Sequence, residues 1–367
     1  ISLIRGAAKN FEDVVIVPSQ ADYSTLHEIL TARGARTTLQ ERRHFARRAF
    51  AVSSHYDSAI FRYFDGEEHS ALRLTADGAK HLRYGENPHQ RGIFYGDLER
   101  YFEQLHGKEL SYNNLQDIEA AVSLIQDFSE PTFGILKHNN ACGCASRPTL
   151  LEAWQAALAG DPVSAFGGVL VANRPVDLET AEEINKLFFE VLIAPDFTAE
   201  ALPILESKKN RILLCQREPI HATWSYRSML GGVLAQETDR AVETTAEMKP
   251  VTKVAPTDKE LVDLVFATKL VKHSKSNAIV LSKDGQLIAS GVGQTSRVDA
   301  LQQAIAKARH FGFDLHGAVL SSDAFFPFDD CVTLAAEAGI TAIAQPGGSV
   351  RDADSIAAAD QIGRAHV

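Results

Sequence analysis

A lysine, a histidine and two asparagines stand together where an apolar run ends, in the segment 136–141 (LKHNNA). Histidine has the only side chain whose unperturbed pKa lies near neutrality, so His138 can accept a proton from an attacking amine. The ammonium group of the neighbouring Lys137 can stabilise a developing oxyanion. These two roles together suit acyl or formyl transfer. A surface Lys-His pair at the end of a strand is the alternative interpretation.

Two other polar segments are candidates for substrate binding. In the segment 83–90 (RYGENPHQ), Arg83 offers a planar fork for a phosphate and Tyr84 offers a ring and a hydroxyl group. A turn with a solvated arginine explains the same residues. In the segment 107–115 (GKELSYNNL), we expect Asn113 or Asn114 to cap the helix that follows.

Three glycine-rich turns precede expected helices. Glycine at such a place lets a ligand approach backbone N–H groups, and a helix N-terminus favours an anion. None of the turns is a dinucleotide-binding fingerprint or a Walker A sequence, and ordinary turn chemistry is the alternative for each. The turns are AFGG at 165–168, GVGQTSR at 291–297 and PGGSVR at 346–351.

Aromatic residues cluster around a proline in the segment 322–328 (SDAFFPF). The segment follows an expected strand and precedes Asp329 and Asp330. Such a cluster would form a rigid apolar wall for a flat heterocycle. A plug in the hydrophobic core is the competing interpretation.

The four cysteines do not predict a disulfide framework or a metal site. Cys142 and Cys144 form a C-x-C sequence, but no second pair and no nearby H-x-E completes a zinc ligand set. We expect these two residues to be small residues in a tight turn. Cys215 and Cys331 are isolated, and we expect no cysteine nucleophile.

Composition limits the class of protein. The chain has 367 residues, and at roughly 100 to 200 residues per domain this predicts two or three domains. Hydrophobic residues make up 45% and charged residues 23%, as in globular proteins. The net charge of −10 argues against binding of nucleic acid polymers or anionic membranes. No apolar run approaches the about 20 residues of a membrane span, so we expect a soluble cytoplasmic protein.

The first 66 residues predict one strand, at 14–17, and several helices. The segment 40–64 carries apolar residues at spacings of three or four, so one face of this helix should be buried. One strand with helices is an incomplete α/β unit, and we interpret the segment as the tail end of a domain. The residues of the expected buried face are Phe45, Ala49, Val52, Tyr56, Ala59, Ile60 and Tyr63.

Helices and strands alternate along the rest of the chain, which predicts α/β architecture in two regions separated by a polar segment at 237–258. In the first region we expect helices at 114–128 and 150–158 and strands at 169–171, 191–194, 212–214 and 229–234. In the second we expect helices through 266, at 298–310, at 332–338 and from 352, with strands at 278–281, 287–290, 318–321 and 341–344.

The two regions share a short sequence similarity. Lys137-His138 and Lys272-His273 each follow an apolar residue near an expected helix. One short match leaves an internal duplication as an open question.

Taken in order along the chain, the motifs closely resemble those of the bifunctional purine biosynthesis family, which joins AICAR transformylase to IMP cyclohydrolase. The resemblance covers nearly the full chain. It rests on the segments above together with KSNA at 275–278 and QPGGS at 345–349.

The resemblance implies an α/β fold with a transformylase region of two cytidine-deaminase-like α/β units without zinc. This region would follow the C-terminal part of a methylglyoxal-synthase-like α/β cyclohydrolase domain. It implies formyl transfer from 10-formyltetrahydrofolate to the 5-amino group of AICAR, giving FAICAR, in a cytosolic homodimer with active sites at the interface and no metal. The implied domains are 1–66 (partial cyclohydrolase), 67–240 (first transformylase lobe), 241–258 (linker) and 259–367 (second lobe).

Site residues are implied by the same motif matches. His138 would be the general base, and Lys137 with Asn277 would stabilise the oxyanion. The substrate-binding residues would be Arg83, Tyr84, Phe166, Gly167, Gly168, Gln294, Arg297 and Phe325; those near the folate would be Phe326, Pro327, Phe328 and Asp330.

Some features depart from the family pattern. Residues 1–66 match only the end of the cyclohydrolase domain, where Lys9 corresponds to a lysine used in ring closure, so we expect no efficient cyclohydrolase activity. Asp329 stands where the family usually has arginine, and the chain stops before the family's basic tail. The first residue is not Met, so we expect the chain to begin within a longer gene product. The alternatives are a catalytically impaired nucleotide-binding fragment and, less favoured, a zinc deaminase.

Overall fold

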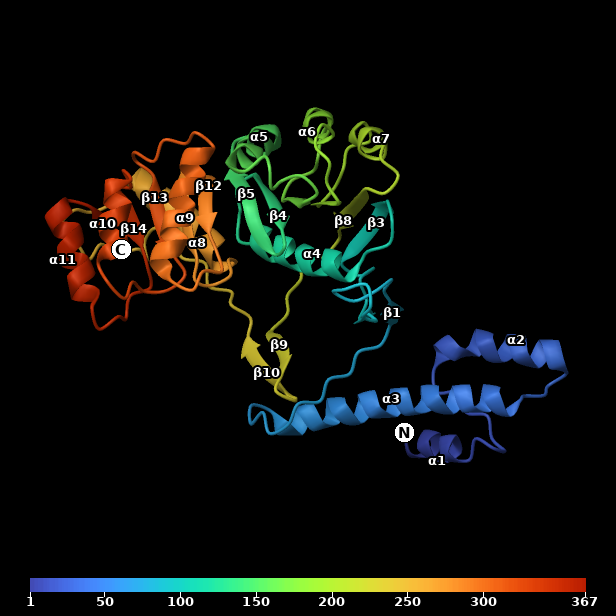
Figure 1. Ribbon diagram of the computed structural model, residues 1–367. Helices are drawn as coiled ribbons and strands as arrows, with labels where there is room; N and C mark the ends of the chain where they lie inside the picture. Colours follow the sequence, from blue (N-terminus) through green and yellow to red (C-terminus); the bar gives the residue numbers. More distant parts are fainter. The chain divides into compact units, whose positions relative to one another are not determined.

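The computed structural model describes residues 1–367 and divides into two compact units, Ile1–Ala79 and Lys80–Val367, which are described separately. The first unit is helical (Figure 1). Its elements are α1 (Ser2–Lys9), the short 3₁₀ helix η1 (Gln20–Asp22), α2 (Tyr23–Arg33) and α3 (Leu39–Asp65).

The long helix α3 confirms the helix expected at 40–64, and a capping box at its start fixes where it begins. The Thr38 side chain accepts from the Glu41 N–H while the Glu41 carboxylate accepts from the Thr38 N–H. Only the first half of the expected apolar face is buried. Phe45 and Ala49 are covered, whereas Tyr63 is 82% exposed.

The strand expected at 14–17 does not form. These residues are half-buried coil, because the first unit holds no neighbouring strand that could accept their backbone hydrogen bonds.

The second unit is built on one sheet of eleven strands in the order β15-β14-β13-β11-β12-β5-β4-β6-β7-β8-β3. Apart from the antiparallel edge strand β3, its first half is a helix and a hairpin followed by helices that alternate with strands, of which the last three are parallel. The elements are β3 (Phe102–His106), α4 (Tyr112–Ile125), β4 (Thr132–Lys137), β5 (Asn140–Ser146), α5 (Leu150–Gly160), β6 (Val169–Ala172), α6 (Leu178–Ile184), β7 (Val191–Ala194), α7 (Ala201–Leu205) and β8 (Ile212–Gln216).

The second half repeats this order of elements. A helix leads into an antiparallel hairpin, and helices then alternate with strands of which the last three are parallel. The elements are α8 (Asp258–Lys272), β11 (Ile279–Lys283), β12 (Gln286–Gly291), α9 (Arg297–His310), β13 (Val319–Ser322), α10 (Asp330–Glu337), β14 (Ala342–Ala344), α11 (Asp352–Ile362) and β15 (Ala365–His366).

The repeat supports the internal duplication that the sequence left open, but not through the residues that suggested it. Lys137 and His138 end β4 and begin the β4–β5 loop, whereas Lys272 and His273 end helix α8. The equivalent of Lys137 is Lys283, which ends β11. The short sequence match therefore paired positions that are not equivalent in the fold.

Helices cover both faces of the large sheet, as Figure 1 shows for α4 on one side and α5 to α7 on the other. Residues of α4 and α8 share one continuous core that crosses both halves. On the opposite face, α5 to α7 close a core over the first half and α9 to α11 close another over the second. Strands covered on both sides consist of continuous apolar runs, which explains why most of them were predictable.

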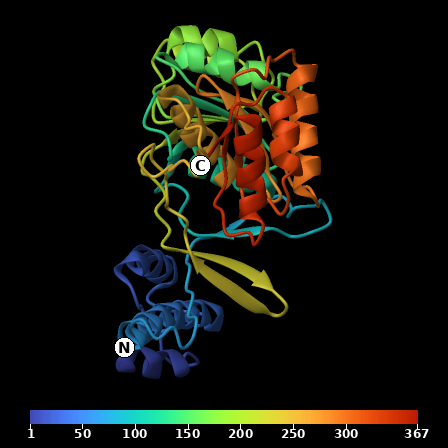
Figure 2. The ribbon, with the colours of Figure 1, turned by 90° about the vertical axis from the view of Figure 1, so that its left-hand side faces the viewer.

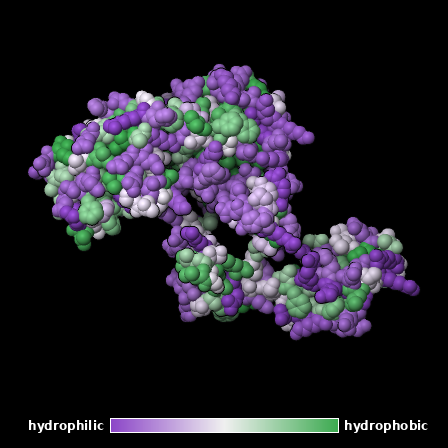
Figure 3. Space-filling view, viewed as in Figure 1, coloured by the Kyte–Doolittle hydropathy of each residue, from purple (hydrophilic) through white to green (hydrophobic).

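One expected buried strand is wrong. The segment 229–234 spans a turn at Leu230 and Gly231 between β9 (Trp224–Met229) and β10 (Gly232–Glu237), which pair only with each other (Figure 2). Apolar side chains of this hairpin face solvent (Figure 3), with Leu230 fully exposed. Another small sheet joins β1 (Ala79–His81) to β2 (Ile93–Tyr95).

Three smaller expectations also need correction. Cys142 and Cys144 lie within strand β5 rather than in a turn. The N-cap of α4 is Ser111, and Asn114 completes its capping box. The segment 165–168 precedes strand β6, not a helix. After β10, residues 238–257 contain neither helix nor strand, as their polar composition predicts. No helix combines the length and apolar character that a membrane span requires.

Candidate active site

The β4–β5 hairpin presents His138 at its tip. Lys137 pairs with Asn140 across the two strands, which leaves His138 and Asn139 as a two-residue loop. Their φ angles are 52° and 64°, as a type I′ turn requires. Positive φ is uncommon outside glycine, so this loop is held in a costly conformation. The exposed His138 ring makes no hydrogen bond within the chain.

Lys137 points from the end of β4 towards an aromatic pair. Its Nζ donates to the Phe166 carbonyl oxygen at 2.8 Å. The Phe166 ring lies 5.1 Å from the Phe188 ring, and both rings are more than half exposed. An ammonium group beside exposed aromatic faces suits a planar, electron-rich ligand.

Gly167 and Gly168 let the backbone pass closely behind this pair. Gly167 has a φ of 74°. A Cβ on Gly168 would lie 2.9 Å from the Leu136 carbonyl oxygen, so no other residue fits there without movement. The structure therefore brings Lys137, His138 and the Phe166 turn together.

Asn140 joins this hairpin to the second half. Its side-chain amide donates to the His138 carbonyl oxygen at 2.8 Å, and its oxygen accepts from the Lys275 N–H at 3.3 Å. Lys275 belongs to the segment between α8 and β11 that also carries Asn277. The His138 loop and the Asn277 segment, which the motif resemblance assigned to one site, are therefore adjacent.

Asn277 lies in a network of polar side chains. Its amide donates to the Gln294 carbonyl oxygen at 3.0 Å, and its oxygen accepts from Arg297 at 2.7 Å. Arg297 also donates to Ser322 at 3.0 Å and forms an ion pair with Asp323. Arg297 is thus buried and engaged, so in this structure it positions Asn277 rather than reaching into solvent.

Asp323 anchors this network. Burial alone would raise the pKa of its carboxyl group, but hydrogen bonds from Ser276, the Ala278 N–H and Arg297, together with the Arg297 charge, hold the pKa below its usual value. The carboxylate is therefore charged at neutral pH, and it fixes the guanidinium that orients Asn277.

Arg83 and Tyr84 form a pair of their own. The Arg83 guanidinium lies 4.9 Å from the centre of the Tyr84 ring and donates to its hydroxyl group at 3.2 Å. The adjacent Leu82 lines a cavity of about 520 Å³ together with Asn139 from the β4–β5 loop. This cavity connects the surroundings of the two motifs, and the exposed Arg83 makes no ion pair.

The aromatic segment 322–328 divides between core and surface. Phe326 is fully buried in the core of the second half, so its ring packs rather than faces a ligand. Phe325 and Phe328 are 44% and 50% exposed. Arg351 lies 5.1 Å from the centre of the Phe328 ring. The core-plug interpretation thus holds for Phe326, while a ligand-facing role for Phe325 and Phe328 stays a prediction.

The remaining candidates lie as follows. Pro327 is exposed, and Asp330 is exposed at the start of α10, where it accepts from the Cys331 N–H. Gln294 donates to the Val292 carbonyl oxygen at 3.0 Å. Lys9 is exposed at the end of α1 in the first unit.

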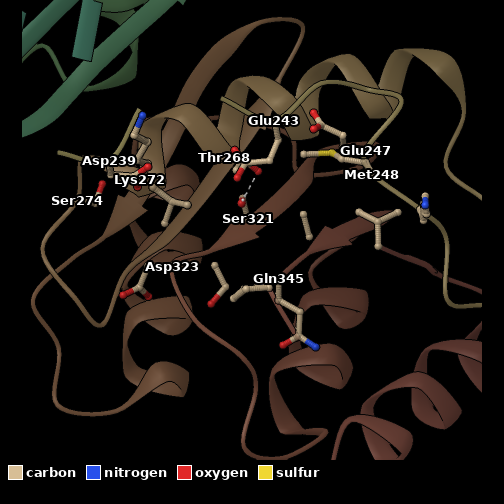
Figure 4. Close-up of a pocket in the computed structure, with 16 residues that line it drawn as sticks. Asp239, Glu243, Glu247, Met248, Thr268, Lys272, Ser274, Ser321, Asp323 and Gln345 are labelled. Carbon is tan, nitrogen blue, oxygen red and sulfur yellow. Dashed lines mark hydrogen bonds between the residues drawn. The ribbon is translucent and has the colours of Figure 1, made fainter. Parts of the chain in front are cut away.

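A cavity of about 550 Å³ lies where the parallel strands β13 and β14 end (Figure 4). Asp323 and Gln345 are among its lining residues, as are Thr268 and Ser321, which share a hydrogen bond. The cavity borders the Asn277 network through Asp323 but does not include His138. The volume of a cavity therefore does not by itself point to His138, the candidate base.

Sequence reasoning missed two acidic residues, one on α4 and one just after its end. Asp117 accepts from the Asn139 N–H at 2.7 Å. Asp127, after the helix, binds Lys272 at 3.1 Å and His273 at 2.7 Å from the second half. Burial alone would raise the pKa of Asp127, but His273 and Lys272 hold it below its usual value. Isolated acidic residues gave no signal in the sequence, because their partners lie far along the chain.

Two further kinds of candidate group are the thiols and the side chains that could ligate a metal. Burial raises the pKa of Cys142 to about 12 and raises that of Cys144 as well, so neither is a thiolate at neutral pH. No group of three His, Cys, Asp or Glu side chains is arranged to hold a metal ion.

Comparison with known proteins gives consistent matches. Residues 7–307 match the family described as "AICARFT/IMPCHase bienzyme". The bifunctional purine biosynthesis protein PurH of Bacteroides thetaiotaomicron is 62% identical over 367 residues, covering 100% of this chain and 72% of that protein. The PurH proteins of Chloroflexus aurantiacus and Rhodospirillum rubrum are 47% and 46% identical, covering 100% of this chain and 72% and 73% of theirs.

Among solved structures, a diaminohydroxyphosphoribosylaminopyrimidine deaminase/5-amino-6-(5-phosphoribosylamino)uracil reductase from Thermotoga maritima matches with a TM-score of 0.22 and 25% identity. The match covers 29% of this chain and 34% of that one. A similarity this slight says nothing about function. The family match and the curated relatives do, and the chain belongs to the AICARFT/IMPCHase bienzyme family of purine biosynthesis.

Proposed function

We propose that the second unit transfers the formyl group of 10-formyltetrahydrofolate to the 5-amino group of AICAR, giving FAICAR. The observation that carries this proposal is the β4–β5 loop, which presents an unpaired imidazole beside an ammonium group and next to the Asn277 network. Family membership supplies the substrates.

His138 is the general base in this proposal. The amine of AICAR is conjugated with its ring and is a weak nucleophile, so its attack on the formyl carbon needs removal of a proton. His138 takes that proton as the new C–N bond forms. The bond from the formyl carbon to N10 of the folate then breaks, and His138 returns the proton to N10 as it leaves. General base catalysis of this kind typically contributes about 10²- to 10⁴-fold in rate.

Lys137 stabilises the oxyanion of the tetrahedral intermediate. Its ammonium group is held by the Phe166 carbonyl oxygen, so it is oriented before the substrate arrives. Asn277 is the second candidate donor. Its amide donates to the Gln294 carbonyl oxygen, and it must turn from that partner to contact substrate.

We assign substrate binding to exposed side chains of the motifs. We assign Arg83 and Tyr84 to the anionic AICAR, because the Arg83 guanidinium makes no ion pair within the chain. The Phe166 turn and Phe325 offer exposed rings to its planar base. Gln294 completes the AICAR side; Pro327, Phe328 and Asp330 are assigned to the folate, and Phe326 supports them from the core.

The domain assignment is also a proposal. We assign residues 67–240 and 259–367 to two cytidine-deaminase-like units of the transformylase, joined by residues 241–258, and the repeated order of elements supports this. Residues 1–66, with Lys9, are assigned to a cyclohydrolase domain of the methylglyoxal-synthase-like type. We further propose a homodimer with active sites at its interface, which light scattering would test.

A spectrophotometric assay tests the proposed function. The chain is incubated with 10-formyltetrahydrofolate, with and without AICAR, and release of tetrahydrofolate is followed. AICAR-dependent release with matching formation of FAICAR is expected. Binding of AICAR without any release would support a nucleotide-binding protein without transferase activity and would contradict the proposal.

A further inference from the structure

The His138–Asn139 loop is held from the side by helix α4. The Asn139 N–H donates to Asp117 Oδ1 at 2.7 Å. The Asn139 side-chain amide, in the orientation that satisfies its neighbours, lies 3.2 Å from the same oxygen and 3.1 Å from the Gln116 carbonyl oxygen. The backbone of Asn139 is therefore fixed by groups from a different element.

This contact acts where the loop is under strain. His138 and Asn139 both have positive φ, and neither is glycine. Left-handed backbone is unfavourable for residues with a Cβ, and it persists where the surroundings fix it. A half-buried carboxylate that accepts the N–H of the second loop residue is such a constraint.

The second half contains an equivalent contact between a helix carboxylate and a hairpin loop. Counted from the N-cap residues Ser111 and Thr257, Asp117 on α4 corresponds to Asp263 on α8. Asp263 accepts from the Asp284 N–H at 2.9 Å and the Gly285 N–H at 2.6 Å, in the two-residue loop between β11 and β12. An acidic residue at this place on the helix thus holds the hairpin loop in both halves.

We propose that Asp117 is a positioning residue for formyl transfer, holding the left-handed loop that presents His138. The inference rests on the proposed function, because it assumes that His138 is the base. Burial raises the pKa of Asp117, while the Asn139 N–H and the His138 charge act in the opposite direction. The hydrogen bond to Asn139 needs only an acceptor oxygen, so charge is not the main requirement.

Three variants of the full chain separate this role from general stabilisation. Asp117→Ala removes the acceptor, and kcat should fall about tenfold or more with little change in KM for AICAR, since a misplaced base loses rate rather than binding. Asp117→Asn keeps an acceptor oxygen and should retain most of the kcat. Glu119→Ala is the matched control, because Glu119 lies on the same helix and makes no hydrogen bond to the loop.

The decisive experiment is rescue of kcat by a glycine at position 139. Asn139→Gly allows positive φ without a constraint, so the double variant Asp117→Ala/Asn139→Gly should recover kcat to within about threefold of Asn139→Gly alone. Failure of that rescue in a folded protein would overturn the proposal. So would a normal kcat in Asp117→Ala, or an equal loss in Asp117→Asn.

Hydrogen exchange at the Asn139 amide distinguishes failure of this inference from failure of the proposed function. Exchange should be faster in Asp117→Ala and remain slow in Asp117→Asn. If the unmodified chain transfers no formyl group, the catalytic role of Asp117 falls with the proposed function. Unchanged exchange in Asp117→Ala would instead show that Asp117 does not hold the loop, even in an active enzyme.

Discussion

The β4–β5 and β11–β12 loops of the two halves have the same backbone conformation but carry different side chains. Each has two residues with positive φ, 52° and 64° in the first half and 55° and 63° in the second. In each, the preceding lysine donates to a backbone carbonyl: Lys137 to Phe166 at 2.8 Å and Lys283 to His316 at 2.6 Å. The lysine contact is thus part of the repeated architecture and is not by itself a sign of catalysis.

The difference lies in the loop residues and in what surrounds them. The second loop is Asp284-Gly285, which suits a type I′ turn, and Arg147 covers it by donating to the Asp284 carbonyl oxygen at 2.6 Å. The Asp284 carboxylate is paired with Lys259. The first loop carries His138 and Asn139 instead and leaves the imidazole unpaired. We call the Asp284–Gly285 loop the closed loop, because Arg147 covers it and its residues favour the turn. We call the His138–Asn139 loop the open loop, because its imidazole is exposed and neither residue is glycine.

The comparison is tested most strongly by removing the equivalent lysines. Lys137→Ala should lower kcat about 10²- to 10³-fold, the usual effect of losing an oxyanion donor. Lys283→Ala removes the same contact from the closed loop and should leave kcat unchanged. Steady-state kinetics on both variants measure this. Equal losses would mean that the lysines serve only the fold.

A second test compares the edge strand β15 with β8, its equivalent in the first half. His366 in β15 occupies the place that Leu213 has in β8, and both its ring nitrogens are buried without partners. Burial lowers the pKa of His366 from 6.5 to about 4. Above pH 6.5 the ring is neutral in both folded and unfolded chains. As pH falls from 6.5 towards 4, only the unfolded chain gains the proton, so stability is lost.

His366→Leu should remove that loss. Between pH 7 and pH 4, the unmodified chain should lose about 3 kcal/mol of unfolding free energy through His366. The variant should not show this loss. Urea denaturation across this pH range measures the difference. Parallel pH profiles for the two proteins would show that His366 is not the group responsible.

The smallest effect is expected from the closed loop itself. Gly285 has a φ of 63°, and a Cβ there would meet its nearest neighbour, the Ser146 carbonyl oxygen, at 3.4 Å, so an alanine fits but is strained. Gly285→Ala should destabilise the protein by about 1–2 kcal/mol, as left-handed backbone does for non-glycine residues. Its kcat should be normal. A loss of activity without a loss of stability would contradict the assignment of this loop to architecture alone.

Much of the fold could be predicted because periodicity is a local property. The strands at 191–194 and 342–344 are buried on both faces, and their apolar runs mark them directly. The strand expected at 14–17 and the one at 229–234 were wrong for the same reason. An apolar run does not reveal whether a partner strand exists, nor whether a glycine inside it makes a turn.

Site residues could be predicted only where the side chain's own functional group indicates its role. His138 and Lys137 could be chosen from their functional groups, and motif resemblance added Asn277. Three other features could not be predicted, because each depends on a partner that only the fold brings near. They are the ion pair of Arg297 with Asp323, the burial of Phe326 and the contact of Asp117 with Asn139. The equivalent aspartates become visible only once the two halves are compared.

The central claim is that the open loop of the first half provides the base for formyl transfer. The most direct measurement is turnover of His138→Ala with AICAR and 10-formyltetrahydrofolate, with Asp284→Ala as the matched change in the closed loop. We predict that His138→Ala loses about 10²- to 10⁴-fold in kcat and keeps AICAR affinity within about threefold, while Asp284→Ala keeps its kcat. Near-normal turnover by His138→Ala would contradict the account.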